Sequence, residues 1–119
     1  MKDDALQMCL LFDFYGSILT ERQQEVFDLY YNEDLSLAEI AEHAEITRQG
    51  VRDALARART ILLNMEEKLG LVRRFRENSK TLERIRTLVE EMLYINSRRF
   101  HSPDFDKRLN EILELAVES

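Results

Sequence analysis

Apolar and polar positions repeat with the period of an α-helix along most of the chain, and capping residues mark the helix starts. Residues 20–23 (TERQ) and 36–39 (SLAE) have the spacing of a capping box, in which two side chains satisfy amides at the helix start. Thr47 and Ser102 are further N-cap candidates, and Pro103 suits the first position of a helix. The pattern predicts helices over residues 3 or 4 to 16, 20 to 32, 36 to 43 or 44, 47 to 69, 71 or 72 to 98, and 102 to 117.

The ends of the first and fourth predicted helices fall at glycines. We expect Asp3 or Asp4 to cap the first helix, and Gly16 to end it with a positive φ. Gly70 directly follows the fourth. Residues 8–15 (MCLLFDFY) are apolar nearly all round, so the first helix must be sandwiched between other elements or meet another subunit.

The two longest predicted helices each carry an apolar seam with steps of three and four residues, as in a coiled coil. The first seam consists of Val51, Leu55, Ala58, Leu62, Met65 and Leu69. The second consists of Leu71, Phe75, Asn78, Leu82, Ile85, Val89, Met92 and Asn96. The seams could fold back on each other at Gly70 or pair between two chains. Leu88, Leu93 and Ile95 widen the second seam beyond what one partner needs, which favours a bundle or a dimer.

Composition excludes a β-rich fold. With three glycines and one proline in 119 residues, the chain lacks the turn formers that a β-sandwich or barrel needs. We therefore expect an all-α fold. Residues 1–70 should form a helix-turn-helix bundle, and residues 71–119 a long helical extension that mediates dimerisation, both packed as part of one compact unit.

The chain also lacks signals for export or membrane insertion. Cys9 is the single cysteine, the first residues have no signal-peptide pattern, and no apolar run approaches the roughly 20 residues of a membrane span. These features predict a reduced cytoplasmic protein.

The net charge of −6 is unevenly distributed. Residues 1–46 carry a net charge of −9, residues 47–80 of +5, and residues 81–119 of −2. The overall charge excludes a protein that coats nucleic acid through its global field, but the basic middle segment could bind an anion locally.

The most informative segment is residues 36–58 (SLAEIAEHAEITRQGVRDALARA). A short helix, a tight turn and a second helix opened by Thr47 form a helix-turn-helix arrangement, whose second helix enters the major groove of DNA. Gly50 is expected to allow close contact with the first helix or with a ligand. The residues expected to pack the two helices together are Leu37, Ile40, Ala41, Ile46, Val51 and Leu55.

The start of the second helix of this pair is the candidate nucleic-acid site. Arginine and glutamine side chains make bidentate contacts to bases, and a helix N-terminus binds phosphate. The candidate residues are Thr47, Arg48, Gln49, Arg52, Arg57 and Arg59. The alternative interpretation is a solvated helix face with a structural role only.

Two features depart from a typical DNA-binding motif. The residue at position 45 indicates a turn that is built differently or a motif that is scaffold only, and the acidic residues of the first helix oppose tight DNA binding. Glu45 occupies a turn position that is often glycine, where a left-handed conformation costs about 1 kcal/mol or more. Glu39, Glu42 and Glu45 place negative charge near the path of a DNA backbone.

The sequence resembles a known family in several segments. They are LFDFY (residues 11–15), LT..Q (19–23), LYY.ED.SL.EIA (29–41), TRQGV (47–51) and EEKLGL (66–71). In these segments, which span about residues 6–75, the chain is similar to the YlxM family of helix-turn-helix regulatory proteins. Residues 36–58 also resemble region 4 of bacterial sigma factors, which reads the −35 promoter element. The resemblance implies an all-helical fold. The family's genes tend to lie beside those of the signal recognition particle, which implies a role in protein targeting.

No residue pattern indicates catalysis or a cofactor. Cys9 lacks a base at nucleophile spacing, and His43 and His101 lack companions at metal-ligand spacing. Glu111, Glu114 and Glu118 fit a solvated helix flank. The aromatic residues Tyr15, Phe27, Tyr30 and Tyr31 lack interleaved basic residues, which favours core packing over stacking on RNA bases.

The sequence therefore leads to two hypotheses. In the first, a non-enzymatic regulatory protein without cofactor or metal binds DNA, or RNA, through the helix that begins at Thr47, as a homodimer. In the second, the helix-turn-helix serves as scaffold in a protein or RNA adaptor of the signal recognition particle.

Overall fold

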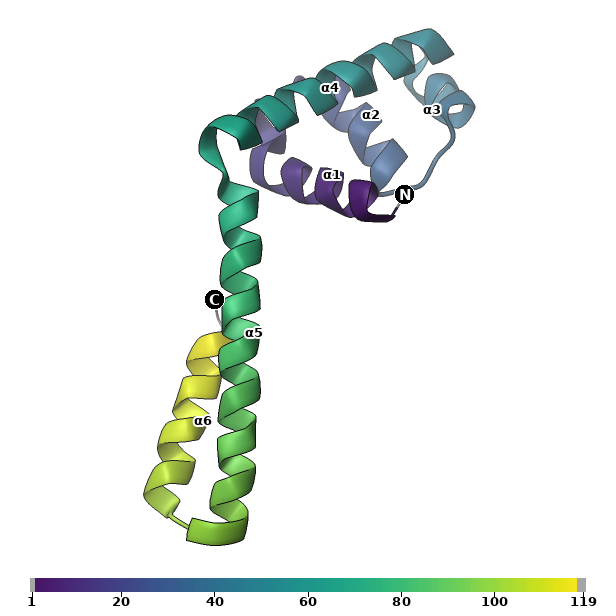
Figure 1. Ribbon diagram of the computed structural model, residues 1–119. Helices are drawn as coiled ribbons and strands as arrows, with labels where there is room; N and C mark the ends of the chain where they lie inside the picture. The colour runs from purple at the N-terminus through teal and green to yellow at the C-terminus, as the bar shows by residue number, and fades with distance from the viewer. Residues whose placement is uncertain (1, 118–119) are drawn as a thin grey trace. The chain divides into compact units, whose positions relative to one another are not determined.

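The computed structural model describes the backbone of residues 2–117 and the side chains of residues 4–117. The described residues contain no strand, which confirms the all-α prediction. The chain forms two compact units, an N-terminal unit that ends at Arg73 and a C-terminal unit that starts at Arg74. None of the helices in this part of the chain is long and apolar enough to cross a bilayer. The helices are α1 (Lys2–Tyr15), α2 (Glu21–Tyr31), α3 (Leu37–Ala44), α4 (Arg48–Leu69), α5 (Leu71–Ile95) and α6 (Pro103–Val117), with a 3-10 turn η1 (Gly16–Ile18) and a π turn η2 (Asn96–Phe100) (Figure 1).

Helix α4 is the central helix of the N-terminal unit, because α1, α2 and α3 all pack against it (Figure 1). Val51, Ala58 and Leu62 from its apolar seam are fully buried. Most of the seam is thus occupied within the N-terminal bundle, whereas Leu69 at its end is exposed. Residues from the other helices complete the core, namely Met8 and Leu11 of α1, Val26 and Phe27 of α2, and Ile40 of α3.

The predicted helix starts are confirmed at most positions. Both capping boxes form, with the Thr20 and Ser36 hydroxyls accepting hydrogen bonds from the third amide of each helix. Thr47 caps α4, and the Ser102 hydroxyl accepts a hydrogen bond from the Phe105 amide at the start of α6. The prediction that Asp3 or Asp4 caps α1 is wrong, because the helix begins at Lys2 and both residues lie inside it.

The glycine that follows α1 has a different role from the one predicted. Gly70, after α4, is the glycine with a positive φ, and Gly16 does not adopt this conformation. A Cβ atom at Gly16 would lie 3.0 Å from the Phe12 ring. A side chain at this position would therefore force the Phe12 ring to shift slightly, so glycine suits the limited space.

The turn between α3 and α4 uses a left-handed residue. Glu45 has φ 59° and ψ 41°, and the amides of Glu45 and Ile46 both donate to the Ala41 carbonyl oxygen. These hydrogen bonds are those of a helix C-cap, in which the left-handed residue is usually glycine. The turn therefore has the geometry of the helix-turn-helix motif, with a strained residue in the position of the glycine.

A polar joint connects the N-terminal unit's first helix to the start of α5. The Tyr15 hydroxyl donates to Glu66 Oε1 at 2.7 Å and accepts from the Leu71 amide at 3.1 Å. The Glu66 carboxylate also accepts from the amides of Val72 and Arg73, each at 3.0 Å. Two side chains thus satisfy three amides that a helix start would otherwise leave without a partner.

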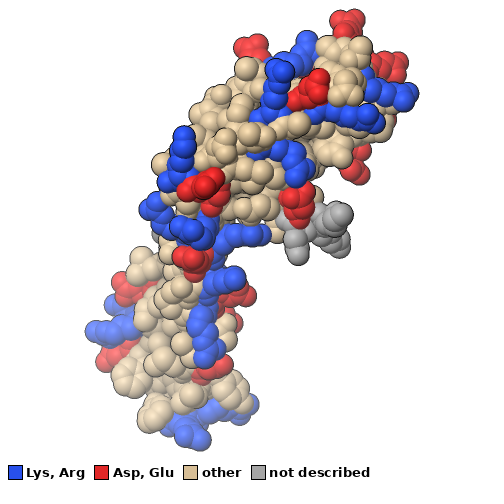
Figure 2. All heavy atoms as spheres, turned by 45° about the horizontal axis from the view of Figure 1, so that its top comes forward, with Lys and Arg blue, Asp and Glu red and all other residues tan. Residues whose placement is uncertain are grey.

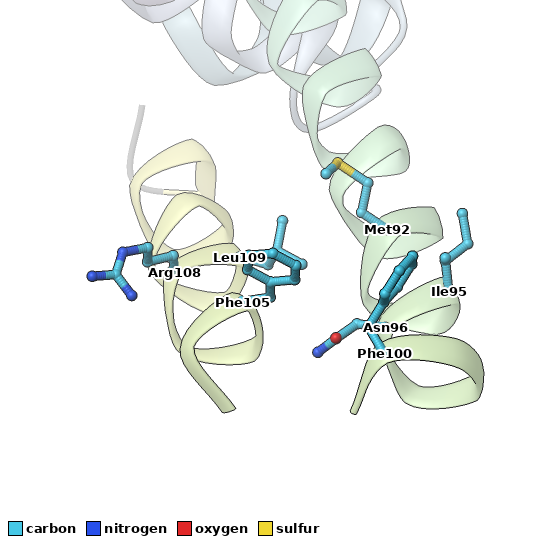
Figure 3. A pocket seen from close by; sticks show the side chains of 7 residues that line it. All are labelled: Met92, Ile95, Asn96, Phe100, Phe105, Arg108 and Leu109. Carbon is cyan, nitrogen blue, oxygen red and sulfur yellow. The ribbon is translucent and has the colours of Figure 1, made fainter. Parts of the chain in front are cut away.

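The C-terminal unit is a helical hairpin in which α5 and α6 run antiparallel (Figure 1). Buried Asn96 closes the hairpin, because its side chain donates to the Ser102 carbonyl oxygen and accepts from the Ser102 amide. The α-helix ends at Ile95, earlier than the predicted residue 98, and η2 leads to His101 in the left-handed conformation. Next to this turn lies an open cavity of about 280 Å³. Phe105 and Leu109 point toward α5 across it, while Arg108 points away (Figure 3).

We predict that replacing the left-handed glutamate stabilises the protein. Glu45→Gly should raise the free energy of unfolding by about 0.5–1 kcal/mol, because glycine adopts the left-handed conformation without a steric cost. Urea unfolding followed by circular dichroism measures the change. Glu42→Gly is the matched control, since the same substitution inside α3 should destabilise the protein by up to about 1 kcal/mol. Equal effects at the two positions would contradict the role assigned to Glu45.

We also predict that the Glu66 joint weakens in acid. Burial of the Glu66 carboxyl group raises its pKa, but hydrogen bonds from Tyr15 and the Val72 and Arg73 amides, with the charge of Arg73, outweigh this effect. The pKa in the folded state is therefore below its ordinary value of about 4.3. The contribution of the ionised group to stability is present above the ordinary pKa and is lost as the pH falls through the lower, folded-state value.

Glu66→Gln should therefore be less stable than the native protein near about pH 6, and this difference should shrink toward about pH 3. Urea unfolding at both pH values measures the difference, and Glu67→Gln, at an exposed neighbour, is the matched control. A stability difference that stays constant between the two pH values would show that the Glu66 charge is not involved.

Candidate nucleic-acid interface

Helices α3 and α4 form the helix-turn-helix pair, and apolar contacts hold it together. Ile40 and Ala41 of α3 and Val51 and Leu55 of α4 are buried in the core shared by the N-terminal helices. Leu37 and Ile46 are partly buried and pack against the same core. The six residues that the sequence assigned to packing thus all contact or form part of the core.

A hydrogen bond from α2 supports the end of α3. Arg22 Nη1 donates to the Ala44 carbonyl oxygen at 2.7 Å. This carbonyl belongs to the last turn of α3, where the backbone acceptors lack partners within the helix. Arg22 therefore fixes the end of α3 just before the turn that leads into α4. The bond joins residues 22 positions apart, so no local sequence pattern indicates it.

The start of α4 is an exposed helix N-terminus. The Thr47 hydroxyl accepts a hydrogen bond from the Gly50 amide at 2.9 Å, so this residue caps the helix. A Cβ atom at Gly50 would lie 3.2 Å from the Thr47 hydroxyl oxygen and 3.6 Å from Ile46 Cδ1. Gly50 therefore fits closely against the turn, whereas the sequence predicted close contact with the first helix or with a ligand.

Arg48 and Arg52 are brought together at this end of α4. Both side chains are exposed and lie one turn apart on the same helix face, about 6 Å along the helix axis. Gln49 is exposed beside them, and its side-chain amide donates to Asp53 Oδ1 at 3.0 Å. Two cationic side chains and a carboxamide thus flank the open amides of the helix start.

The structure places Arg57 and Arg59 apart from this group. Arg57 is exposed, but the 100° step per residue puts it about 140° around α4 from Arg52. Arg59 Nη1 donates to the Tyr31 hydroxyl at 2.6 Å and lies 3.5 Å from Asp4 Oδ2. Arg59 therefore has partners on α1 and α2 within the bundle.

Tyr31 belongs to the aromatic cluster of α1 and α2. Its ring lies against Phe27 and meets Tyr30 edge to face. Burial raises the pKa of the Tyr31 hydroxyl, and the charge and hydrogen bond of Arg59 partly offset this effect. Phe27 and Tyr15 are buried, while Tyr30 is exposed.

Acidic side chains surround the candidate site. Glu39, Glu42 and Glu45 on and after α3 are exposed. Hydrogen bonds from Ser36 lower the pKa of the Glu39 carboxyl group, so it carries its charge at neutral pH. Figure 2 shows basic and acidic side chains interleaved over the N-terminal helices. A polyanion would meet both signs of charge there.

Other reactive side chains do not form a site in the part of the chain that the structure describes. The Cys9 thiol lies 3.6 Å from Asn32 Oδ1, and burial together with the charge of Asp13 raises its pKa. His43 and His101 are exposed. Within residues 4–117, no three His, Cys, Asp or Glu side chains are grouped in a way that could hold a metal ion.

Comparison with known proteins identifies relatives over nearly the whole chain. Residues 2–98 match the family described as "Putative helix-turn-helix protein, YlxM / p13 like". A UPF0122 protein of Thermoanaerobacter sp. (strain X514) is 46% identical over 112 residues, which cover 94% of this chain and 92% of the relative. A UPF0122 protein of Acetivibrio thermocellus is 45% identical over 118 residues, which cover 98% and 99%. The similarity extends well past residue 75, where the sequence resemblance was expected to end.

Proposed function

The chain belongs to the YlxM / p13-like family of helix-turn-helix proteins, and from this premise we propose that it is a non-enzymatic regulator that binds duplex DNA through the start of α4. The observation that carries the proposal is the arrangement of Arg48 and Arg52 beside an exposed helix N-terminus. In a helix-turn-helix protein this end of the second helix contacts base edges in the major groove.

The three exposed polar side chains at this end suit the two kinds of contact that DNA offers. Arginine can hydrogen-bond to the O6 and N7 atoms of guanine, and glutamine to the N6 and N7 atoms of adenine. The open amides of α4 suit a backbone phosphate. Arg48, Gln49 and Arg52 would therefore select the sequence, while Thr47 holds the helix start in place.

The regulator would act as a homodimer through its C-terminal hairpin. One side of α5 carries a stripe of exposed apolar residues, in which Ile85 is 37% exposed, Leu88 41%, Met92 53% and Ile95 44%. Helix α6 leaves Phe105, Ile112 and Leu115 exposed as well. Two hairpins that pack through these surfaces would form a four-helix bundle and cover the open cavity beside Phe105.

A second candidate function is a protein adaptor of the signal recognition particle. The observation that favours it is the exposed row of acidic side chains on and after α3, namely Glu39, Glu42 and Glu45. They would repel a DNA backbone but attract a basic protein surface. In this case the helix-turn-helix would serve as scaffold, and the family's gene neighbourhood would point to the partner.

We predict that Arg48→Gln with Arg52→Gln weakens sequence-specific DNA binding. The probe is a duplex selected by the native protein from a random-sequence library, with a scrambled duplex as reference. The double variant should lose about tenfold or more in affinity for the selected duplex, because one bidentate base contact contributes about 1–3 kcal/mol. Arg98→Gln with Arg99→Gln removes the same charge from the C-terminal unit and should retain the preference for the selected duplex.

The outcome also separates the two candidate functions. Failure of the native protein to enrich any duplex would contradict the DNA proposal. A protein partner that is recovered from cell extract after nuclease treatment, is lost on Glu42→Lys with Glu45→Lys, and is retained on Arg48→Gln with Arg52→Gln would support the adaptor instead.

We predict that the native protein has twice the chain mass of 14.1 kDa at micromolar concentration. Leu88→Glu with Met92→Glu should yield the single-chain mass by light scattering, because burial of two carboxylates in an apolar interface is unfavourable. Leu6→Glu with Leu63→Glu, at exposed residues of the N-terminal unit, is the matched control. A native protein with the mass of one chain would contradict the dimer.

A further inference from the structure

Helix α5 carries a row of basic side chains that the helix-turn-helix does not include. Arg76, Lys80 and Arg84 follow one another at intervals of four residues and are all exposed. Because residues four apart lie on the same face of a helix, the three side chains form one stripe. With a rise of 1.5 Å per residue, the stripe extends about 12 Å along α5. Figure 2 shows basic side chains in a row along this helix.

The stripe faces away from the partner helix in the hairpin. Val89 of α5 is buried in the C-terminal unit, and it lies nine residues after Lys80, which is about half a turn around the helix. Leu82 is partly buried on the same side as Val89. The part of α5 that carries Val89 and Leu82 therefore packs within the hairpin, and the basic side faces solvent.

The local charge is strongly positive. Residues 73–86 contain six basic and two acidic residues, so this part of α5 has a net charge of +4 in a chain whose total is −6. At the start of α4, by contrast, Arg48 and Arg52 lie close in sequence to Asp53 and to the acidic residues of α3. A polyanion therefore meets less repulsion at the stripe than at the recognition helix.

We propose that the α5 stripe binds the phosphodiester backbone of a nucleic-acid duplex without regard to its base sequence. This inference rests on the proposed function, because it assigns a second surface to a protein that binds nucleic acid. A straight row of cations matches a ligand whose negative charges are evenly spaced along a line. An anionic membrane is a poorer match, since the exposed apolar residues of α5, such as Leu88 and Met92, belong to the dimer interface of the proposed function and would not be free to enter lipid.

The two surfaces would divide the work of binding. Phosphate contacts supply affinity that depends on salt and carry no sequence information, whereas base contacts supply selectivity. The stripe would provide the first contribution and the start of α4 the second. A protein with a negative total charge would thereby hold a polyanion through one basic helix face.

The test compares the full-length native protein with the triple variant Arg76→Gln, Lys80→Gln, Arg84→Gln. The matched control is Arg98→Gln, Arg99→Gln, Lys107→Gln, which removes the same charge from exposed residues of the same unit. Affinity for a duplex DNA and for a duplex RNA of equal length is measured by fluorescence anisotropy over a series of salt concentrations. Circular dichroism verifies that both variants retain their helices.

The triple variant should show a salt dependence of log affinity for duplex DNA that is shallower by about 2 to 3, since each phosphate contact contributes about 0.9 for B-DNA. Its affinity at about 0.1 M salt should fall at least tenfold, while the control variant stays near the native value. The duplex with the larger loss identifies the physiological type of ligand. A slope equal to that of the native protein with both duplexes would overturn the proposal.

This result is separable from a failure of the proposed function. If Arg48→Gln with Arg52→Gln abolishes sequence preference while the triple variant keeps the native slope, the DNA-binding proposal stands and the stripe is refuted. If the triple variant loses its salt dependence while the Arg48 and Arg52 variant binds like the native protein, the stripe stands and recognition by α4 is refuted. If the native protein binds neither duplex, both are refuted.

Discussion

Burial of one face of α4 against three other helices determines how the N-terminal unit is built. Each fully buried leucine- or valine-sized side chain contributes about 1.5–3 kcal/mol, and Val51 and Leu62 of α4 are both inaccessible to solvent. Because the apolar seam fixes the rotation of α4, it also decides which residues remain outside. Arg48 and Arg52 are exposed at the helix start for the same reason that Val51 and Leu55 are buried. The candidate interface is therefore a consequence of core packing.

Local sequence patterns predicted the helices well, because caps and seams act over three or four residues. Thr20, Ser36 and Thr47 each cap a helix through a contact with a residue three positions away. Contacts between distant residues carry no such signal. The hydrogen bond of Arg22 to Ala44 and the bond of Tyr15 to Glu66, which lie 51 residues apart, depend on how the helices pack. The start of α1 was misplaced because acidic residues are favourable both at a cap and in the first turn.

The sequence predicted the residues of the candidate site from their side-chain chemistry, and the structure separates these residues in space. Arg48, Gln49 and Arg52 share one end of α4, whereas Arg59 contacts Tyr31 and Asp4 at the surface of the bundle. An arginine that completes a tertiary contact cannot be told from a surface arginine by its neighbours in the sequence. The same limit applies to charge. At about 0.1 M salt, exposed charges act over roughly 10 Å, so the acidic residues of α3 matter for α4 more than the total charge does.

The polar joint at the start of α5 has a consequence for how the chain folds as it is synthesised. Tyr15 lies near the start and Glu66 near the end of the N-terminal unit's sequence. The amides that hydrogen-bond to them belong to Leu71, Val72 and Arg73, at the end of the same unit. Every contact of the joint is thus available once residue 73 has left the ribosome, before α6 exists. Because domains generally fold as units from the N-terminus, the bundle can close and set the first turn of α5 while the rest of that helix is still being made. The remaining residues of α5 would then be added to a first turn that is already formed.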